Sequence, residues 1–331
     1  MRAWLLKEQD KIENRPLELV KIPDPKPGRK DIIIEVKAVG ICRTDLHVAE
    51  GDLPMHKSLL ILGHEVAGIV REVGSEVGKF QIGDRVGIAW LNSACGRCEF
   101  CLSGRENLCP KASFTGWDVD GGFAELAKIS QEFAYALPDD IPFQECAPLM
   151  CPGIAGYRSY ALTGVGEDMK LGLYGFGITG TYVIQIAQRL GVEVFVVTRS
   201  EMNKEEARRL GASWVGGYDD AFPMKLDAAI IFPAVGELVP IALKHIKAGG
   251  RLILAPVTMT PIVIEDFNLV WGEREIKSLA HITRGDGDGL IELAKQKRFE
   301  TRVETFPFED LLDAMIRVKR GEVNGNAVII L

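Results

Sequence analysis

The chain has 331 residues, of which 47% are hydrophobic and 26% charged, and its formal net charge is −7 at neutral pH. This length and composition predict a globular protein with material for two domains. The apolar runs are short and strand-like, which excludes a membrane-spanning helix, and basic residues are interspersed with acidic ones, which argues against a nucleic-acid surface. We therefore expect a small-molecule partner, with neither nucleic acid nor membrane.

The first half of the chain has the pattern of antiparallel β-structure. Proline and glycine crowd residues 23–28, which predicts an extended connection after an amino-terminal hairpin. Apolar and polar residues partly alternate over 31–39, and shorter β-rich runs follow at 65–73 and 85–89 with glycines between them. This pattern is typical of an irregular β-barrel.

Four cysteines, Cys95, Cys98, Cys101 and Cys109, form a C-x-x-C-x-x-C-x7-C run. Four thiolates at this spacing can converge on one tetrahedral zinc ion in a closed, structural site. A disulfide framework is the alternative. The chain begins MRAWLLKEQD without an apolar leader and leaves Cys146 as an odd thiol, so we expect a reducing, cytoplasmic compartment and zinc.

Three further candidate ligands are scattered along the chain: Cys42 in GICRTDLH, His64 in LGHE and Cys151 in LMCPG. Each alone is more typical of a buried thiol or a core histidine. Together they supply three nitrogen and sulfur ligands and leave the fourth position of a zinc ion open. An open position is what a catalytic zinc site requires.

From about residue 153 the pattern changes to strands alternating with helices. We expect strands at 170–174, 192–197, 228–232 and 249–255, the last after a glycine C-cap, and helices at 181–190, 204–210 and 239–246. This alternation predicts a parallel, doubly wound sheet. The charged tail over 290–331 is largely helix-forming and ends in a strand at 327–331.

Gly175, Gly177 and Gly180 form a G-x-G-x-x-G turn between a predicted strand and a predicted helix. The motif alone is weak evidence, because glycines also serve ordinary turns. Inside a βαβ unit, however, the bare backbone lets a pyrophosphate approach the positive N-terminus of the helix. We therefore predict a dinucleotide site.

The residues after the next strand, Thr198, Arg199 and Ser200, bear on the choice of dinucleotide. An NAD enzyme usually has an acidic residue there, which binds the ribose hydroxyls and would repel a 2′-phosphate. This chain has a guanidinium and two hydroxyls instead, which favours NADP over NAD. A solvated Arg199, or one that stacks on adenine in an NAD enzyme, is the alternative.

The segment from Gly63 to Val77 matches the zinc signature G-H-E-x2-G-x5-[GA]-x2-[IVSAC] in full. With Cys42, the GDRV at 83–86, the four-cysteine run, Cys151 and the glycine turn in the same order, the chain resembles the zinc-dependent alcohol dehydrogenases of the medium-chain dehydrogenase/reductase superfamily nearly end to end. The resemblance implies an α/β fold: a GroES-like irregular β-barrel catalytic domain at 1–152, a Rossmann domain at 153–282, and a return to the catalytic domain at 283–331.

The resemblance also implies roles for residues around the second zinc site. In the family, counterparts of Thr44 contact the alcohol and relay its proton through the nicotinamide ribose to His47, which exchanges it with solvent. Counterparts of Asp45 orient the ligating histidine, here His64, and counterparts of Glu65 can approach the metal during ligand exchange. Further matches are Arg43 near the cofactor pyrophosphate and Leu53 and Trp90 along the substrate pocket, although a solvated charge or core packing are the plainer readings of these three.

Two positions depart from the family pattern: Asn326 stands where many relatives have a phosphate-binding arginine, and His281 where relatives often have glycine. The implied function is reversible hydride transfer between primary or simple secondary alcohols and NAD(P), with two zinc ions per chain and a homodimer or homotetramer. The alternatives are a polyol dehydrogenase, which commonly has an acidic ligand in place of Cys151, a zinc-free quinone or enoyl reductase of the same fold, and a zinc-binding structural protein.

Overall fold

The computed structural model describes residues 1–331, which form two compact units. The first unit contains residues 1–154 and 281–331, and the second contains residues 155–280. The helix α4 (Pro152–Thr163) carries the chain from the first unit into the second. No helix of the protein combines the length and the apolarity that a bilayer crossing demands.

The first unit is built mainly from β-strands. Its strands are β1 (Arg2–Leu6), β2 (Leu17–Lys21), β3 (Asp31–Gly40), β4 (Glu65–Val73), β5 (Arg85–Ile88), β6 (Leu91–Ser93), β7 (Ser113–Phe114), β8 (Leu126–Ser130), β9 (Ala134–Ala136), β16 (Val303–Pro307) and β17 (Asn326–Ile330). Its helices are α1 (Arg43–Glu50), α2 (Glu99–Leu102), α3 (Phe143–Cys146), α8 (Arg284–Gln296) and α9 (Leu311–Arg320). Short 3₁₀ turns lie at Ile12–Asn14, Glu106–Leu108, Gln131–Phe133, Ala147–Met150 and Phe308–Asp310.

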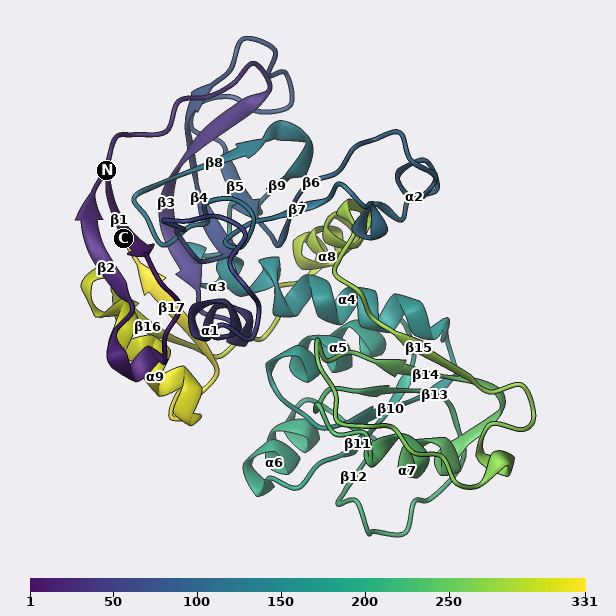
Figure 1. Ribbon diagram of the computed structural model, residues 1–331. Helices are drawn as coiled ribbons and strands as arrows, with labels where there is room; N and C mark the ends of the chain where they lie inside the picture. Colours follow the sequence, from purple (N-terminus) through teal and green to yellow (C-terminus); the bar gives the residue numbers. More distant parts are fainter. The chain divides into compact units, whose positions relative to one another are not determined.

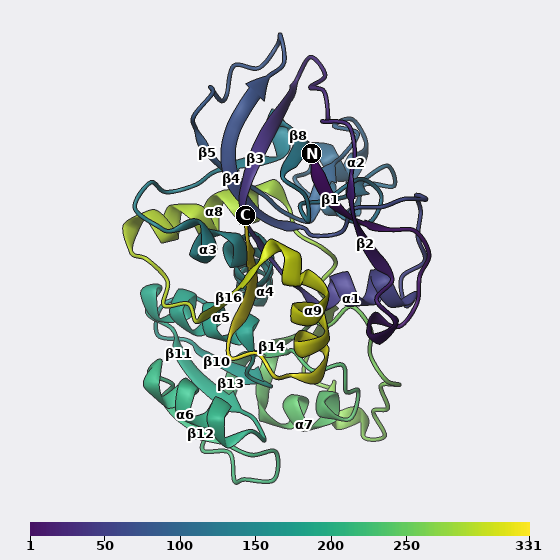
Figure 2. The same ribbon diagram turned by 90° about the vertical axis from the view of Figure 1, so that its left-hand side faces the viewer.

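The central strand of the first unit is β3. It pairs with β4, β8 and β17, all antiparallel, within a seven-stranded sheet. Six of the strands follow the order β16-β17-β3-β4-β5-β9, and β8 pairs with β3 outside this order. Figure 2 shows the yellow carboxyl-terminal segment beside the purple and blue strands, and the β17–β3 ladder joins them by hydrogen bonds. The sequence predicted a largely helical segment at 290–331 that ends in a strand, but the structure has a further strand in it. Strand β16 lies between α8 and α9 and pairs parallel with β17.

The second unit is a parallel sheet of order β12-β11-β10-β13-β14-β15 (Figure 1). Its elements are β10 (Lys170–Tyr174), α5 (Ile178–Arg189), β11 (Glu193–Val197), α6 (Glu201–Arg209), β12 (Trp214–Gly216), β13 (Leu226–Ile231), α7 (Leu238–His245), β14 (Ile246–Leu254), a 3₁₀ turn (Phe267–Leu269) and β15 (Glu275–Ser278). The strand order reverses at β10, with β11 on one side and β13 on the other. Ligands of doubly wound sheets bind at such a switch point, at the carboxyl ends of the strands.

The doubly wound sheet confirms the predicted fold class, but three local boundaries differ from the sequence prediction. Helix α5 begins at Ile178, directly after the glycine turn, and α6 begins at Glu201 because the Ser200 hydroxyl caps it. The expected glycine C-cap before the fourth strand is wrong. Helix α7 ends at His245, Ile246 is already extended, and Gly249 with φ 72° lies inside β14.

Candidate functional site

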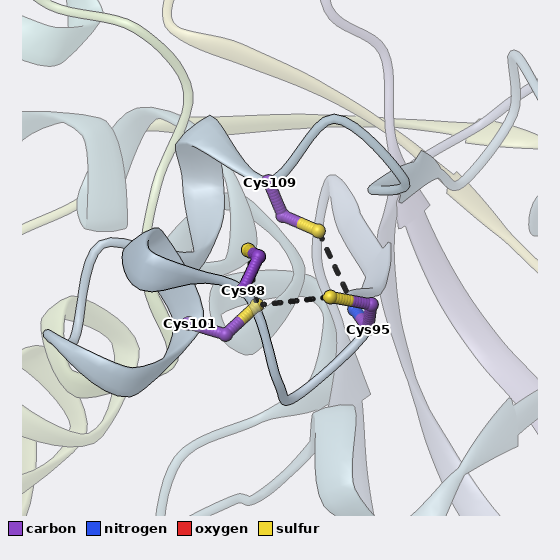
Figure 3. A group of neighbouring side chains, drawn as sticks. All are labelled: Cys95, Cys98, Cys101 and Cys109. Atoms are coloured by element: carbon purple, nitrogen blue, oxygen red, sulfur yellow. Dashed lines mark hydrogen bonds between the residues drawn. The ribbon is translucent and has the colours of Figure 1, made fainter.

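The four-cysteine lobe lies on the connection between β6 and β7, and Figure 3 shows its four cysteine side chains gathered together. The four sulfur atoms all lie within 4.8 Å of one another, with Cys98 and Cys101 3.5 Å apart and Cys95 and Cys101 3.9 Å apart. Zinc bonded to four sulfurs at its usual length gives a tetrahedron with edges of about 3.8 Å, whereas a disulfide needs about 2 Å. All seven cysteines are free thiols. The donor set therefore fits a zinc ion.

Backbone amides stabilise negative charge on this lobe. The amides of Cys95 and Lys111 both donate to the Cys109 sulfur at 3.4 Å. Hydrogen bonds from the backbone around Arg97 lower the pKa of Cys95 to about 6, while burial raises the pKa of Cys101 to about 12. Amide donors aimed at sulfur favour the thiolate form, which is the form that binds zinc.

The second cluster joins three segments that are distant in the sequence. Cys42 caps the N-terminus of α1, His64 directly precedes β4, and Cys151 lies between a 3₁₀ turn and α4. The sulfur atoms of Cys42 and Cys151 are 3.8 Å apart, and ligand atoms of these three residues and Glu65 lie within 4.8 Å of one another. Their sulfur separation matches the edge of a zinc tetrahedron, about 3.8 Å.

Asp45 connects two of these candidate ligands. Its buried carboxylate accepts from the Cys42 amide at 2.8 Å and the Gly63 amide at 3.2 Å, and it lies 3.0 Å from His64 Nδ1. Burial alone would lower the pKa of His64, but the Asp45 charge raises it well above its ordinary value. A carboxylate on Nδ1 leaves Nε2 for the metal and raises the basicity of the ring.

The pKa values of Cys42 and Cys151 are shifted in opposite directions. The hydrogen bond with Cys151 holds the pKa of Cys42 well below its ordinary value, and the same contact raises the pKa of Cys151. Beside them, burial raises the pKa of Glu65. Glycine at position 40 makes room for this carboxylate, because a Cβ at Gly40 would lie 1.9 Å from Glu65 Oε2.

Helix α1 carries Thr44 and His47 three residues apart, a spacing that puts side chains on one face of a helix. The Thr44 hydroxyl lies 3.6 Å from the Cys42 sulfur. The His47 side chain is 38% exposed, and its Nδ1 lies 2.7 Å from a carboxylate oxygen of Asp52. The sequence analysis did not identify Asp52 as the partner of His47, although an acidic residue five positions after the histidine could have indicated it.

Trp90 lies directly against the second cluster. Its indole contacts the His64 ring edge-on, with centroids 4.9 Å apart and an interplanar angle of 75°. Leu53 lies on the loop after α1, where its amide donates to the His47 carbonyl at 3.1 Å. Arg43 is the first residue of α1 and is exposed.

In the second unit the glycine turn follows β10 and opens α5. A Cβ at Gly175, which has φ 77°, would lie 2.5 Å from the Pro233 ring, so this position requires glycine. Gly177 is the N-cap of α5, and a Cβ there would meet no atom within 4 Å. A Cβ at Gly180 would lie 3.1 Å from the Phe176 ring. Open space at the first turn of a helix fits a pyrophosphate.

The residues after β11 present no acidic side chain. Thr198 is buried, and its amide donates to the Gly216 carbonyl at 2.9 Å. The Arg199 guanidinium lies 5.7 Å above the centre of the Tyr218 ring, and Ser200 accepts from the Asn203 amide. Tyr218 therefore holds the arginine at the end of the strand, a role that only the folded chain reveals.

The two departures from the family pattern have local structural reasons. Asn326 is buried at the start of β17, and its side-chain amide donates to the Arg302 carbonyl at 2.9 Å. This hydrogen bond shows that Asn326 helps to hold the start of β17 in place. His281 has φ 56°, a left-handed conformation in which glycine is usually the least strained residue.

Two family models match the chain: the alcohol dehydrogenase GroES-like domain over residues 28–139 and the zinc-binding dehydrogenase domain over residues 179–296. The probable alcohol dehydrogenase AdhA of Mycobacterium tuberculosis is 41% identical over 339 residues, covering 100% of this chain and 97% of the relative. An alcohol dehydrogenase of Geobacillus stearothermophilus is 34% identical over 324 residues, covering 95% of this chain and 96% of the relative.

Among solved structures, the cobalt- and zinc-bound thermostable alcohol dehydrogenase from Pyrobaculum aerophilum superimposes with a TM-score of 0.89 at 25% identity, covering 100% of this chain and 99% of that one. The relatives extend over the whole chain, and the donor sets of both cysteine clusters suit zinc. This chain therefore belongs to the zinc-dependent alcohol dehydrogenases of the medium-chain dehydrogenase/reductase superfamily and is an oxidoreductase.

Proposed function

We propose that this alcohol dehydrogenase binds two zinc ions per chain, prefers NADP(H), and interconverts primary or simple secondary alcohols with aldehydes or ketones. The observation that carries the proposal is the group of Cys42, His64 and Cys151, whose ligand atoms lie within 4.8 Å of one another. Three such donors leave a tetrahedral zinc ion one position for substrate, where it acts as a Lewis acid that lowers the pKa of an alcohol.

The side chains of α1 handle the proton of the alcohol. Thr44 Oγ1, beside the Cys42 sulfur, accepts the proton and passes on its own, and His47 exchanges protons with water because its side chain is partly exposed. Asp52 binds His47 Nδ1 and leaves Nε2 free to accept. A nicotinamide bound at the second unit would accept the hydride from the carbinol carbon, which would leave the aldehyde or ketone as product.

Glu65 and the four-cysteine lobe have separate tasks. A carboxylate oxygen of Glu65 lies within 4.8 Å of the three candidate ligand atoms, so Glu65 can approach the metal during ligand exchange. The lobe offers four sulfur donors and no open position, so its zinc holds structure. Both sites need reduced thiols, which suits the cytoplasm.

The preference for NADP(H) rests on residues 198–200 of the second unit. Arg199, held over Tyr218, offers a charged fork to a 2′-phosphate, and the hydroxyls of Thr198 and Ser200 add donors. The turn at Gly175, Gly177 and Gly180 would hold the pyrophosphate at the N-terminus of α5. Arg43, at the start of α1, is a further candidate for the phosphates.

A homodimer formed through the second unit is supported by the free edge of its sheet. Strand β15 ends the sheet, and all four of its residues are exposed. Large apolar side chains are also exposed in β15 and in the connection that precedes it. Their exposed fractions are 69% for Val257, 60% for Val263, 66% for Phe267, 67% for Trp271 and 37% for Ile276. An edge strand with apolar neighbours is a template for pairing with a second copy. Light scattering after gel filtration tests this proposal: a monomer would contradict it.

The function as a whole is tested with the purified protein and a panel of alcohols and aldehydes, each assayed with NADP(H) and NAD(H) in parallel, together with metal analysis. We expect zinc-dependent turnover and higher kcat/KM with NADP(H). Turnover that survives complete removal of zinc would contradict the catalytic site. A tenfold or greater preference for NAD(H) would contradict only the assignment of Arg199.

A further inference from the structure

Five rings of the first unit lie nearly parallel, in a group that we call the aromatic wall: His56, Trp117, Trp90, Phe114 and His281. Trp90 contacts Phe114 and Trp117 with centroids 5.3 and 5.8 Å apart and interplanar angles of 20° and 16°. Phe114 and His281 are 4.3 Å apart, and His56 stacks on Trp117 at 4.4 Å. The wall begins at the candidate zinc site, because Trp90 touches His64.

Two indole N–H groups fix the wall. Trp117 donates to the Pro54 carbonyl at 2.9 Å. Trp90 donates to Nδ1 of His281 at 3.0 Å, across 191 positions of the chain. Because Nδ1 accepts this bond, the ring is in the neutral tautomer that carries its proton on Nε2.

The backbone conformation of His281 sets the direction of its side chain. Its φ of 56° lies in the left-handed region, which few residues other than Gly, Asn, Asp and His adopt. The next residues are fixed by the capping box of α8, in which the Thr283 hydroxyl and the Asp286 carboxylate exchange hydrogen bonds. This left-handed backbone, next to a capped helix start, places the imidazole against Trp90 and Phe114.

We propose that His281 is a positioning residue that holds Trp90 in the plane of the aromatic wall, and that the wall selects flat conjugated or aromatic alcohols and aldehydes over saturated ones of equal size. This inference rests on the proposed function. A flat ring stacks against a wall whose indole cannot rotate, whereas a puckered ring loses this contact. Trp90 acts on the substrate, and His281 acts through Trp90.

The test compares benzyl alcohol with cyclohexylmethanol, which differ in flatness but hardly in size, in wild type and in His281→Gly, His281→Asn and Trp90→Phe. Glycine removes the acceptor and relieves the backbone. Asparagine tolerates the same φ, and its side-chain oxygen can accept the Trp90 N–H without providing a ring. We expect a wild-type preference of about tenfold for benzyl alcohol, set by one aromatic stacking contact.

We expect His281→Gly and Trp90→Phe each to lower this preference by about three- to tenfold, mainly through KM for benzyl alcohol, while His281→Asn stays within about twofold of wild type. Combining His281→Gly with Trp90→Phe should lower it no further, because both changes remove the same bond. If His281→Gly fails to fold, Trp90→Phe and His281→Asn decide the question alone.

Three results would overturn the inference. One is a wild type that turns over cyclohexylmethanol as well as benzyl alcohol, which leaves the alcohol dehydrogenase activity in place. Another is an equal loss of kcat/KM for both alcohols in His281→Gly, which indicates a purely structural residue. The third is an absence of turnover on benzyl alcohol by an enzyme that oxidises other alcohols of the panel, which removes this inference and leaves the proposed function in place.

Discussion

Replacing Asp45 by asparagine should weaken zinc binding at the proposed catalytic site while leaving zinc binding by the four-cysteine lobe unchanged. The carboxylate accepts from the Cys42 and Gly63 amides and binds His64 Nδ1. Asparagine has one acceptor oxygen. If that oxygen keeps His64 and Gly63, the new NH₂ group faces the Cys42 amide across 2.8 Å, so two donors meet and the negative charge is gone.

The magnitude follows from this count of contacts. One charged hydrogen bond is lost, at a cost of about 1.5–3 kcal/mol, and the histidine loses the partner that fixes its tautomer. A change in the carboxylate behind a ligating histidine typically weakens metal binding by about 10- to 100-fold, which is roughly 1.4–2.7 kcal/mol. The two estimates agree, so we expect a loss of zinc affinity of that size at the catalytic site.

The assay is a titration with a zinc chelator, following both total zinc and turnover. Asp52→Asn is the matched control, because Asp52 is also an acid on the α1 side of the site but binds His47 and no candidate ligand. In Asp45→Asn, activity should disappear at a chelator concentration that leaves the four-cysteine zinc bound. Unchanged zinc affinity at the catalytic site, with the variant folded, would refute the reasoning.

Four further outcomes are expected. Thr44→Ala should lower kcat by about 100-fold or more with zinc still bound, and near-normal turnover would contradict the proton relay. Cys98→Ser should leave about one zinc per chain by metal analysis and lower the melting temperature, without changing the substrate preference of the remaining active enzyme. Arg199→Ala should reduce kcat/KM for NADP(H) by about 10- to 100-fold and barely affect NAD(H). Burial opposes ionisation of Glu106, but backbone hydrogen bonds and the Arg284 guanidinium bring its pKa below the ordinary value. The ionised Glu106 therefore stabilises the fold above pH 4.5, and this stabilisation is lost as the pH falls through the lowered pKa. Glu106→Gln should reduce the free energy of unfolding at neutral pH by about 1–2 kcal/mol, and denaturant titrations at several pH values should show a smaller loss of stability in acid than in wild type.

Sequence periodicity predicted the doubly wound sheet because four of its six strands and all three of its helices carry their own signal, whereas the short edge strands β12 and β15 were not predicted. The limits of the prediction lie where one residue has two possible roles. Ser200 was assigned to the cofactor, yet it also caps α6, which is why that helix begins at Glu201 rather than three residues later. Gly249 was expected to end a helix, but Ile246 is already paired with Leu226, and this ladder extends the strand backwards.

Some residues of the candidate site were identifiable from the sequence, and others were not. Cys42, His64 and Cys151 were identifiable from local motifs, and the structure brings them together. Their partners were harder to find, because the contacts are made across the fold. The bond between Trp90 and His281 spans 191 positions and has no periodic signal. Single-sequence reasoning could flag His281 only as an unusual residue, and its neighbour had to come from the structure.

The start of α1 shows why the chemistry of this site depends on helix capping. Cys42 is the N-cap residue, and its sulfur accepts from the Asp45 amide while the Asp45 carboxylate accepts from the Cys42 amide, so the capping box that begins the helix also orients a metal ligand. The same carboxylate reaches His64. Thr44 lies within the first turn, and His47 follows one turn later on the same face. A single local motif thus sets the positions of one proposed zinc ligand, of the group that would orient another, and of both ends of the proposed proton path, so changes in the first turn of α1 should affect metal affinity and turnover together.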